Sequence, residues 1–340
     1  MNIETVEQLD DALSQPPEWL VESLAQVDGD ILVLGVAGKM GPTLARMARR
    51  ASDQAGIDRR IIGVARFSKA AEQQKLQGWG IETIKADLLD EQAVAGLPDA
   101  PNVVFMAGMK FGSTGGEAMT WAMNAVVPAI VASRYRDCRI AVFSTGNVYG
   151  LVPVFSGGSA ETDSFNPTGE YAMSCLGRER IFEHFSRTHG TPMSIIRLNY
   201  ACELRYGVLV DLATRVKNRQ PIDLTMGSFN VIWQGDANAH ALASLIDCDS
   251  PPFAINVTGP EILSVRTISE QLAKHMNLPV TFEGKESPTA LLNNASTSHC
   301  RYGVPAVSVS ELLNNVAVWV NENGDSLGKP TGFEVRDGKF

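Results

Sequence analysis

The sequence predicts an α/β protein built on a doubly wound parallel sheet, with a small C-terminal α/β domain. Up to residue 200, apolar runs of strand length alternate with helical patterns, which is typical of βαβ units. The first apolar run ends in a glycine-rich turn, and the alternation breaks down after residue 200. Because crossovers between parallel strands are right-handed, the doubly wound arrangement is the expected one.

The predicted elements follow one another in pairs. Strands are expected at 30–36, 60–66, 81–88, 102–108, 139–145 and 193–199, and the helices between them at 42–55, 68–77, shortly after 88, 117–134 and 168–189. Later come helices at 207–220, 267–277 and 309–322 and a strand at 252–259, which we expect to return to the first sheet.

These elements divide the chain into four parts. We predict a helical N-terminal extension (1–28), a main sheet domain (29–200), a smaller domain formed mainly by 201–322, and a loop-like tail (323–340). The tail contains four glycines and several charged residues, so we expect neither helix nor strand there.

Composition excludes several classes of protein. A formal net charge of −9 argues against a general binder of nucleic acid or of an anionic membrane surface. The acidic start lacks the basic and apolar regions of a signal peptide, and no apolar run approaches the length of a membrane span. Five scattered cysteines without CxxC spacing indicate reduced thiols in a cytoplasmic protein, and neither cysteines nor histidines predict a metal site.

A glycine-rich turn follows the first predicted strand. The stretch "GVAGKMGP" places Gly35, Gly38 and Gly41 at GxxGxxG spacing, with Lys39 and Met40 between the last two. Residues without Cβ let the backbone approach a diphosphate, and the following helix offers free N–H groups and a positive dipole. Directly after the first strand of a βαβ series, this pattern predicts a dinucleotide site.

The end of the second predicted strand bears on which dinucleotide binds. NAD-binding proteins usually carry an acid there for the ribose 2′-hydroxyl, whereas an arginine accommodates the 2′-phosphate of NADP. This chain has "GVARFS", with Arg66 and no nearby acid. The pattern favours NADP, and NAD is the alternative cofactor. Arg66 has an alternative interpretation as well, in which it stacks on the adenine or faces solvent.

Taken together, these motifs resemble the extended short-chain dehydrogenase/reductase superfamily, in its NAD(P)-dependent epimerase/dehydratase branch. The resemblance spans about residues 29–322 and includes "KADLLD" (85–90), "VVFMAG" (103–108), "FSTGNVYG" (143–150), "YAMSCLGRE" (171–179) and several later stretches. It implies a Rossmann domain followed by a small substrate domain, with the substrate bound between them.

The resemblance also implies roles for individual residues. Asp87 and Leu88 would lie at the adenine, and Ala107 and Gly108 would line the cofactor. Thr145 would hydrogen-bond the reacting oxygen, Tyr171 would act as acid and base, and Asn124 would support a water that relays protons.

The catalytic pair departs from the family pattern at Cys175. The family has YxxxK, whose lysine holds the nicotinamide ribose and lowers the tyrosine pKa, but here Cys175 follows Tyr171 at that distance. A neutral thiol cannot supply that charge. Lys110 or Arg178 would then replace the cation, or the reaction needs a weaker base, or catalysis is lost. We interpret Cys175 as a small packing residue rather than a nucleophile.

The sequence thus yields two functional hypotheses. The first is an enzyme that oxidises, reduces or epimerises a hydroxyl-bearing carbon of a sugar, nucleotide-sugar or polyol. The second is a catalytically impaired NAD(P)-binding module that acts as a sensor or interaction partner. The resemblance further implies a homodimer formed by the 117–135 and 172–189 helices. Arg205, Arg215 and Arg301 are candidates for contact with a carboxylate or phosphate of the substrate, and solvated surface arginines are the other interpretation.

Overall fold

A computed structural model describes residues 3–110 and 112–339. The main domain is a seven-stranded parallel sheet in the order β12-β7-β5-β4-β1-β2-β3. Its strands are β1 (Ile31–Leu34), β2 (Ile61–Ala65), β3 (Glu82–Lys85), β4 (Asn102–Phe105), β5 (Arg139–Thr145), β7 (Met193–Leu198) and β12 (Phe253–Val257). The chain reverses direction across the sheet between β1 and β4, which is the switch point where doubly wound folds bind ligands.

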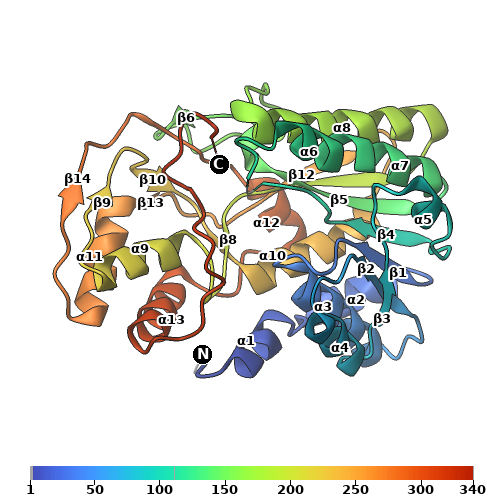
Figure 1. The fold of residues 1–340 in the computed structure, drawn as a ribbon, viewed down its shortest axis with the longest axis horizontal. Helices are drawn as coiled ribbons and strands as arrows, with labels where there is room; N and C mark the ends of the chain where they lie inside the picture. Colours follow the sequence, from blue (N-terminus) through green and yellow to red (C-terminus); the bar gives the residue numbers. More distant parts are fainter. Residues whose placement is uncertain (1–2, 111, 340) are drawn as a thin grey trace.

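Helices cover both faces of this sheet (Figure 1). One face packs against α2 (Glu18–Ala25), α3 (Gly41–Gln54), α4 (Ala70–Gly78) and α10 (Gln234–Ala243). The other packs against α5 (Glu91–Ala95), α7 (Val127–Arg134) and α8 (Gly169–His189). Successive residues of β1 alternate between the two cores, Ile31 and Val33 facing one and Leu32 and Leu34 the other, as expected for a strand buried on both sides.

The predicted 117–134 helix is interrupted by a π-turn. It consists of α6 (Glu117–Trp121), the π-helical turn η1 (Ala122–Val126) and α7. Pro128 has no N–H to donate to the carbonyl of Asn124, four residues earlier, so the regular ladder fails at that point. Such turns often mark functional sites, and this one contains Asn124.

The second domain has its own core, centred on three helices. These are α9 (Val208–Lys217), α11 (Val265–Met276) and α13 (Val309–Asn321). Short strands accompany them in two-stranded pairs: β6 (Val152–Pro153) with β15 (Thr289–Ala290), β8 (Ala201–Cys202) with β11 (Ile232–Trp233), β9 (Ile222–Asp223) with β14 (Phe282–Glu283), and β10 (Ser228–Phe229) with β13 (Leu263–Ser264). The remaining elements are η2 (Gly146–Val148), η3 (Ser244–Asp247) and α12 (Ser296–Tyr302).

The N-terminal extension joins both domains. Leu9 and Leu13 of α1 (Val6–Leu13) are buried in the core of the second domain, whereas Leu20 and Leu24 of α2 are buried against the sheet. The two helices of the extension thus link the two cores.

The tail after α13 crosses the front of the molecule from the second domain toward α8 (Figure 1). Residues 323–339 form neither helix nor strand; residues 323–330 are mostly exposed, whereas the segment from Thr331 to Gly338 is packed. Phe333 is 1% exposed and lies in the second core. Both the N–H and the hydroxyl of Thr331 donate to Asp211 of α9, and Arg336 donates to the Thr289 carbonyl. No helix in the described part of the chain is long and apolar enough to cross a membrane.

Candidate active site

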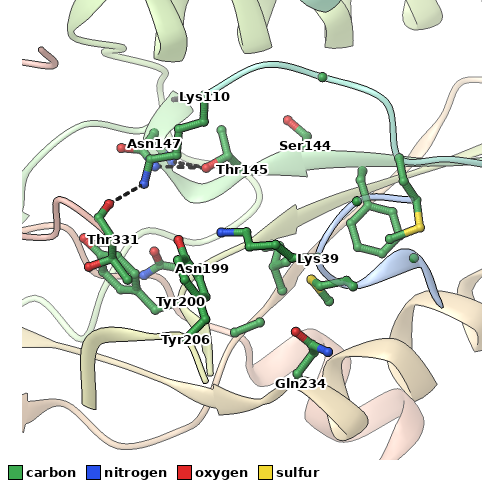
Figure 2. A pocket seen from close by; sticks show the side chains of 18 of the residues that line it. Lys39, Lys110, Ser144, Thr145, Asn147, Asn199, Tyr200, Tyr206, Gln234 and Thr331 are labelled. Atoms are coloured by element: carbon green, nitrogen blue, oxygen red, sulfur yellow. Dashed lines mark hydrogen bonds between the residues drawn. The ribbon is translucent and has the colours of Figure 1, made fainter. Parts of the chain in front are cut away.

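A pocket of about 400 Å³ lies where the two domains and the tail meet. The glycine turn after β1 and the ends of β4 and β5 form one side, and the start of α9 and the tail form another. Figure 2 shows side chains from these separate segments converging on one space. The pocket is therefore at the carboxyl ends of the parallel strands, where this fold class binds ligands.

The glycine turn is shaped to hold a diphosphate. Gly35 has φ +89°, and a Cβ there would lie 2.8 Å from the Ala107 backbone nitrogen. A Cβ on Gly41 would lie 2.3 Å from the Val36 carbonyl oxygen. The turn therefore requires glycine at positions 35 and 41. Helix α3 begins at Gly41 and directs its free N–H groups toward the pocket. The residues present therefore fit a dinucleotide.

Two hydroxyl side chains lie in the same pocket as the glycine turn. Thr145 ends β5 and Tyr171 stands in the first turn of α8. The two side chains share a hydrogen bond, which lowers the pKa of Tyr171, as does the positive charge of Arg178. Burial and the neighbouring Cys175 act more strongly and raise that pKa well above its ordinary value. The phenol is consequently protonated at neutral pH.

Cys175 and Asn124 lie behind the wall of the pocket. Cys175 is fully buried beside Val148 and Tyr149, and burial raises its thiol pKa. The Asn124 amide donates to the Met109 carbonyl and to Ser174 Oγ, both at 2.9 Å, and lies 4.0 Å from Cys175 Sγ. Asn124 therefore links the π-turn to α8.

Arg178 extends from the next turn of α8 into the pocket. Its Nη1 donates to the Phe143 carbonyl of β5 at 2.7 Å, and its Nη2 donates to Asn124 Oδ1 at 2.6 Å. A Cβ on Gly108 would lie 2.3 Å from Nη2. The guanidinium therefore occupies the space between the ends of β4 and β5, and a glycine at position 108 leaves room for it.

Two lysines also reach the pocket. The Lys110 ammonium donates to the Thr331 carbonyl at 2.9 Å and lies 5.9 Å from the centre of the Tyr171 ring. The Lys39 ammonium lies 3.1 Å from the centre of the Tyr206 ring. Burial lowers the pKa of Lys110 to about 8, and burial together with the charge of Lys110 lowers that of Lys39 to about 7.

A buried polar cluster supports the end of β5. Glu179 of α8 pairs with Arg197 of β7 at 2.9 Å and accepts a hydrogen bond from Ser144 at 2.5 Å. Arg197 also donates to the Tyr149 hydroxyl at 2.6 Å. Since Tyr149 donates in turn to Asn256, its hydroxyl is committed to structure.

The predicted site residues separate into three groups. The pocket is lined by Gly35, Gly38, Lys39, Met40, Gly41, Gly108, Thr145 and Tyr171. Asn124 and Cys175 lie one layer behind. The pocket lining does not include Arg66 and Asp87, whose side chains are exposed, or Leu88 and Ala107, which are buried in the core.

The candidate substrate arginines are engaged elsewhere. Arg205 pairs with Glu203, Arg215 with Glu334 and Arg301 with Asp247, and none of the three lines the pocket. The pocket is also lined by residues that are not among the predicted ones: Asn147, Asn199, Tyr200, Tyr206, Lys329 and Thr331. No motif marks these residues, because long-range packing brings them together.

The fold and site define a dinucleotide-binding α/β protein, and comparison with known proteins specifies the family. The family model "NAD dependent epimerase/dehydratase family" matches residues 31–221, more than half of the 340 residues. The chain belongs to this family. A search of curated proteins found no significant match.

Solved structures share the fold over most of the chain. UDP-glucuronic acid 4-epimerase from Bacillus cereus, in complex with NAD, is 19% identical with a TM-score of 0.72, covering 88% of this chain and 99% of that one. UDP-glucose 4-epimerase from Thermotoga maritima, with UDP-glucose, is 16% identical (TM-score 0.71; 86% and 99% covered). dTDP-glucose 4,6-dehydratase from Streptomyces venezuelae, a double mutant with NAD bound, is 18% identical (TM-score 0.73; 86% and 97% covered).

Proposed function

We propose that the protein is an NAD(P)-dependent enzyme that oxidises, reduces or epimerises a hydroxyl-bearing carbon of a sugar, nucleotide-sugar or polyol. The observation that carries this proposal is the shared pocket: a glycine turn fit for a diphosphate and a hydrogen-bonded Thr145–Tyr171 pair line the same space. Family membership and the sugar-nucleotide enzymes with the same fold support it.

The cofactor would be held by the backbone of the glycine turn. Gly35, Gly38 and Gly41, with the backbone of Lys39 and Met40, would surround the diphosphate at the start of α3. Ala107 and Gly108 would border the cofactor, and Asp87 with Leu88 the adenine. A bound nicotinamide supplies a hydride acceptor or donor.

A preference for NADP remains part of the proposal. Arg66 follows β2 and its side chain is exposed, so it is available to a 2′-phosphate. The epimerase from Bacillus cereus and the dehydratase from Streptomyces venezuelae were solved with NAD. Tighter binding of NADH than of NADPH in parallel titrations would refute the NADP preference.

Tyr171 would exchange a proton with the substrate oxygen. Because its raised pKa keeps the phenol protonated, it is prepared to donate a proton to a carbonyl oxygen that is being reduced. Thr145 would hydrogen-bond the same oxygen. In the oxidative direction the phenol must first lose its proton, so that direction should accelerate as pH rises. Asn124 would act through its contacts with α8, or by supporting a relaying water.

Arg178 would supply the positive charge that the missing lysine provides elsewhere in the family. Its guanidinium is fixed by Phe143 and Asn124 and lowers the Tyr171 pKa. A planar cation with fixed donors is also suited to hydroxyl groups of a ribose. Lys110, 5.9 Å from the Tyr171 ring centre, is the rival candidate.

The alternative function is a binding module without turnover. Its supporting observation is the environment of Tyr171, where burial and the Cys175 thiol raise the phenol pKa and oppose its action as a base. In that case the chain would bind the cofactor and respond to it without transferring hydride.

We also propose a cytoplasmic homodimer. Met119, Trp121, Val126 and Met173 are between 38% and 50% exposed on α6, η1 and α8. Apolar side chains on neighbouring helices form a face that a second copy would cover. All five cysteines are free thiols, in keeping with a reducing compartment.

Cofactor titration and turnover assays test the proposal together. Reduced-nicotinamide fluorescence measures binding, and absorbance with chromatography measures reaction of UDP-glucose, UDP-glucuronic acid, dTDP-glucose and free sugars. Tyr171→Phe should reduce turnover about 100-fold or more and preserve cofactor binding. Tyr135→Phe removes a buried hydroxyl bound to Pro98 outside the pocket and serves as control. Tight cofactor binding without turnover would favour the binding module, and no cofactor binding would refute both.

A further inference from the structure

Three lysines from distant parts of the chain line one pocket. Lys39 belongs to the glycine turn, Lys110 follows β4, and Lys329 lies in the C-terminal tail. Figure 2 shows Lys39 and Lys110 entering from different sides, with the Lys110 ammonium directed at Thr331. The charges of Lys110 and Lys329 both act on Lys39 and lower its pKa. The three cationic groups therefore share one region of the pocket.

Asp211 and Glu203, whose charges act on these lysines, do not line the pocket. Asp211 accepts two hydrogen bonds from Thr331, at 2.8 and 2.5 Å, and Glu203 pairs with Arg205 at 3.0 Å. Gathering like charges in a partly buried space costs free energy unless an anion offsets it. The pocket thus carries an excess of positive charge where a ligand would lie.

The position of Lys110 separates its ligand from the cofactor diphosphate. The diphosphate site is the glycine turn at the start of α3, whereas Lys110 lies 5.9 Å from the Tyr171 ring centre and contacts the tail. Tyr171 is where a substrate would react. An oxyanion held by Lys110 would therefore belong to the substrate, and Lys329 lines the same pocket from the tail.

The neutral part of the lining suits a compact polyol. Asn147, Asn199, Tyr200 and Tyr206 offer amides and hydroxyls around the lysines. The volume of about 400 Å³ is at the low end for a site that holds one small molecule, and the glycine turn, which borders the same space, needs part of it for the cofactor. A small substrate fits this space better than a nucleotide-linked sugar does.

We infer that the pocket binds a compact anionic polyol, a sugar acid or a sugar phosphate, whose oxyanion is held by Lys110 and Lys329 with Lys39 beside it. The inference rests on the proposed function and narrows its substrate class. The oxyanion fixes the hydroxyl-bearing carbon beside Tyr171 and Thr145. Carboxylate and phosphate offer the same chemistry to ammonium groups, so the experiment includes both.

Calorimetric titration of the full-length protein tests the inference. D-glucuronate and D-glucose 6-phosphate are compared with neutral D-glucose and with UDP-glucose, with and without saturating NAD. At least one of the small anions should bind more tightly than D-glucose, and its affinity should fall as ionic strength rises. Lys329→Gln should weaken that binding about 10- to 100-fold and leave NAD affinity unchanged. Lys339→Gln, an exposed lysine of the same tail that pairs with Asp337, should change neither.

Each contrary result has a distinct meaning. Equal binding of D-glucose and both anions would overturn the inference, as would equal losses in the two lysine variants. Tight binding of UDP-glucose that depends on Lys329, without binding of the small anions, would assign the lysines to a nucleotide diphosphate and also overturn it. Failure to bind any nicotinamide nucleotide would refute the proposed function, while the titrations without NAD would still decide whether the lysines bind an anion.

Discussion

Introducing a lysine at position 175 of α8 tests how the protein sets the pKa of Tyr171 without the usual lysine. The Cys175 thiol shares a hydrogen bond with the phenol, so an ammonium group of Cys175→Lys would lie roughly 5 Å from it. At an effective dielectric constant of about 20, such a charge is worth about 3 kcal/mol, or roughly two pH units in the tyrosine pKa. Because the pocket admits water, we expect a decrease of about one to two pH units.

The neighbouring arginine determines which variant shows this effect. Arg178 Nη2 binds Asn124 Oδ1 at 2.6 Å, and Asn124 Nδ2 lies 4.0 Å from Cys175 Sγ. The ammonium group of a lysine at position 175 would lie near the Arg178 guanidinium. Repulsion between the two cations would lower the pKa of the new lysine and destabilise the fold. Cys175→Lys combined with Arg178→Ala removes that repulsion, but it also removes the lowering of the Tyr171 pKa by Arg178. The effect of the new lysine is therefore measured as the difference between the double variant and Arg178→Ala alone.

Carbon NMR of protein labelled at the tyrosine ζ position measures this pKa without a substrate. The chain has six tyrosines, and Tyr171→Phe identifies the relevant signal. Cys175→Met, neutral and similar in length to lysine, is the control. In oxidative turnover at pH 7 the double variant should exceed Arg178→Ala about tenfold or more. Equal Tyr171 titration in the double variant and in Arg178→Ala would refute the argument that charge on α8 reaches the phenol.

Three further predictions concern the turn, the buried lysine and the exposed helices. Gly41→Ala would place a Cβ 2.3 Å from the Val36 carbonyl oxygen and should weaken reduced-nicotinamide binding more than tenfold by fluorescence, whereas Gly78→Ala, with open space around it, should not. Lys39 has a folded-state pKa of about 7, below its unfolded value of 10.5, so the unfolded chain binds more protons between these pH values. The contribution of Lys39 to the free energy of unfolding should therefore rise by at most about 1.4 kcal/mol per pH unit from pH 7 to 10. In urea titrations, Lys39→Gln should be more stable than the wild type at pH 7 and should lack this rise with pH. An equal rise in the wild type and in the variant would contradict the assigned pKa. Val126→Asp should convert the proposed dimer to a monomer in light scattering, and a wild-type protein that is already monomeric would refute the dimer.

Local patterns in the sequence were sufficient to predict the sheet and the glycine turn. Buried parallel strands such as "DILVLGV" are continuous apolar runs, and β1 forms within that run at Ile31–Leu34. The turn is equally local, because Gly41 is required by its own neighbour Val36. The spacing of Tyr171, Cys175 and Arg178 along one helix was also readable, since residues three to four apart share a face.

Contacts between distant segments were not predictable in this way. The glycines and charges of the tail are local features, but nothing local indicates that Thr331 binds Asp211 or that Lys329 lines the pocket. Likewise, Arg205 was a candidate for an anionic group because charge is visible in the sequence, whereas its partner Glu203 is recognised only from the side-chain geometry. Pro128 is visible in the sequence, but the π-helical turn that it accompanies at Asn124 is not predictable from it.

The end of the tail has a practical consequence for handling this protein. A Cβ on Gly338 would lie 2.2 Å from the Thr168 carbonyl oxygen, directly before the helix that carries Tyr171. An affinity tag fused after the last residue would begin close to that contact and could disturb the phenol, so purification tags belong at the other end of the polypeptide.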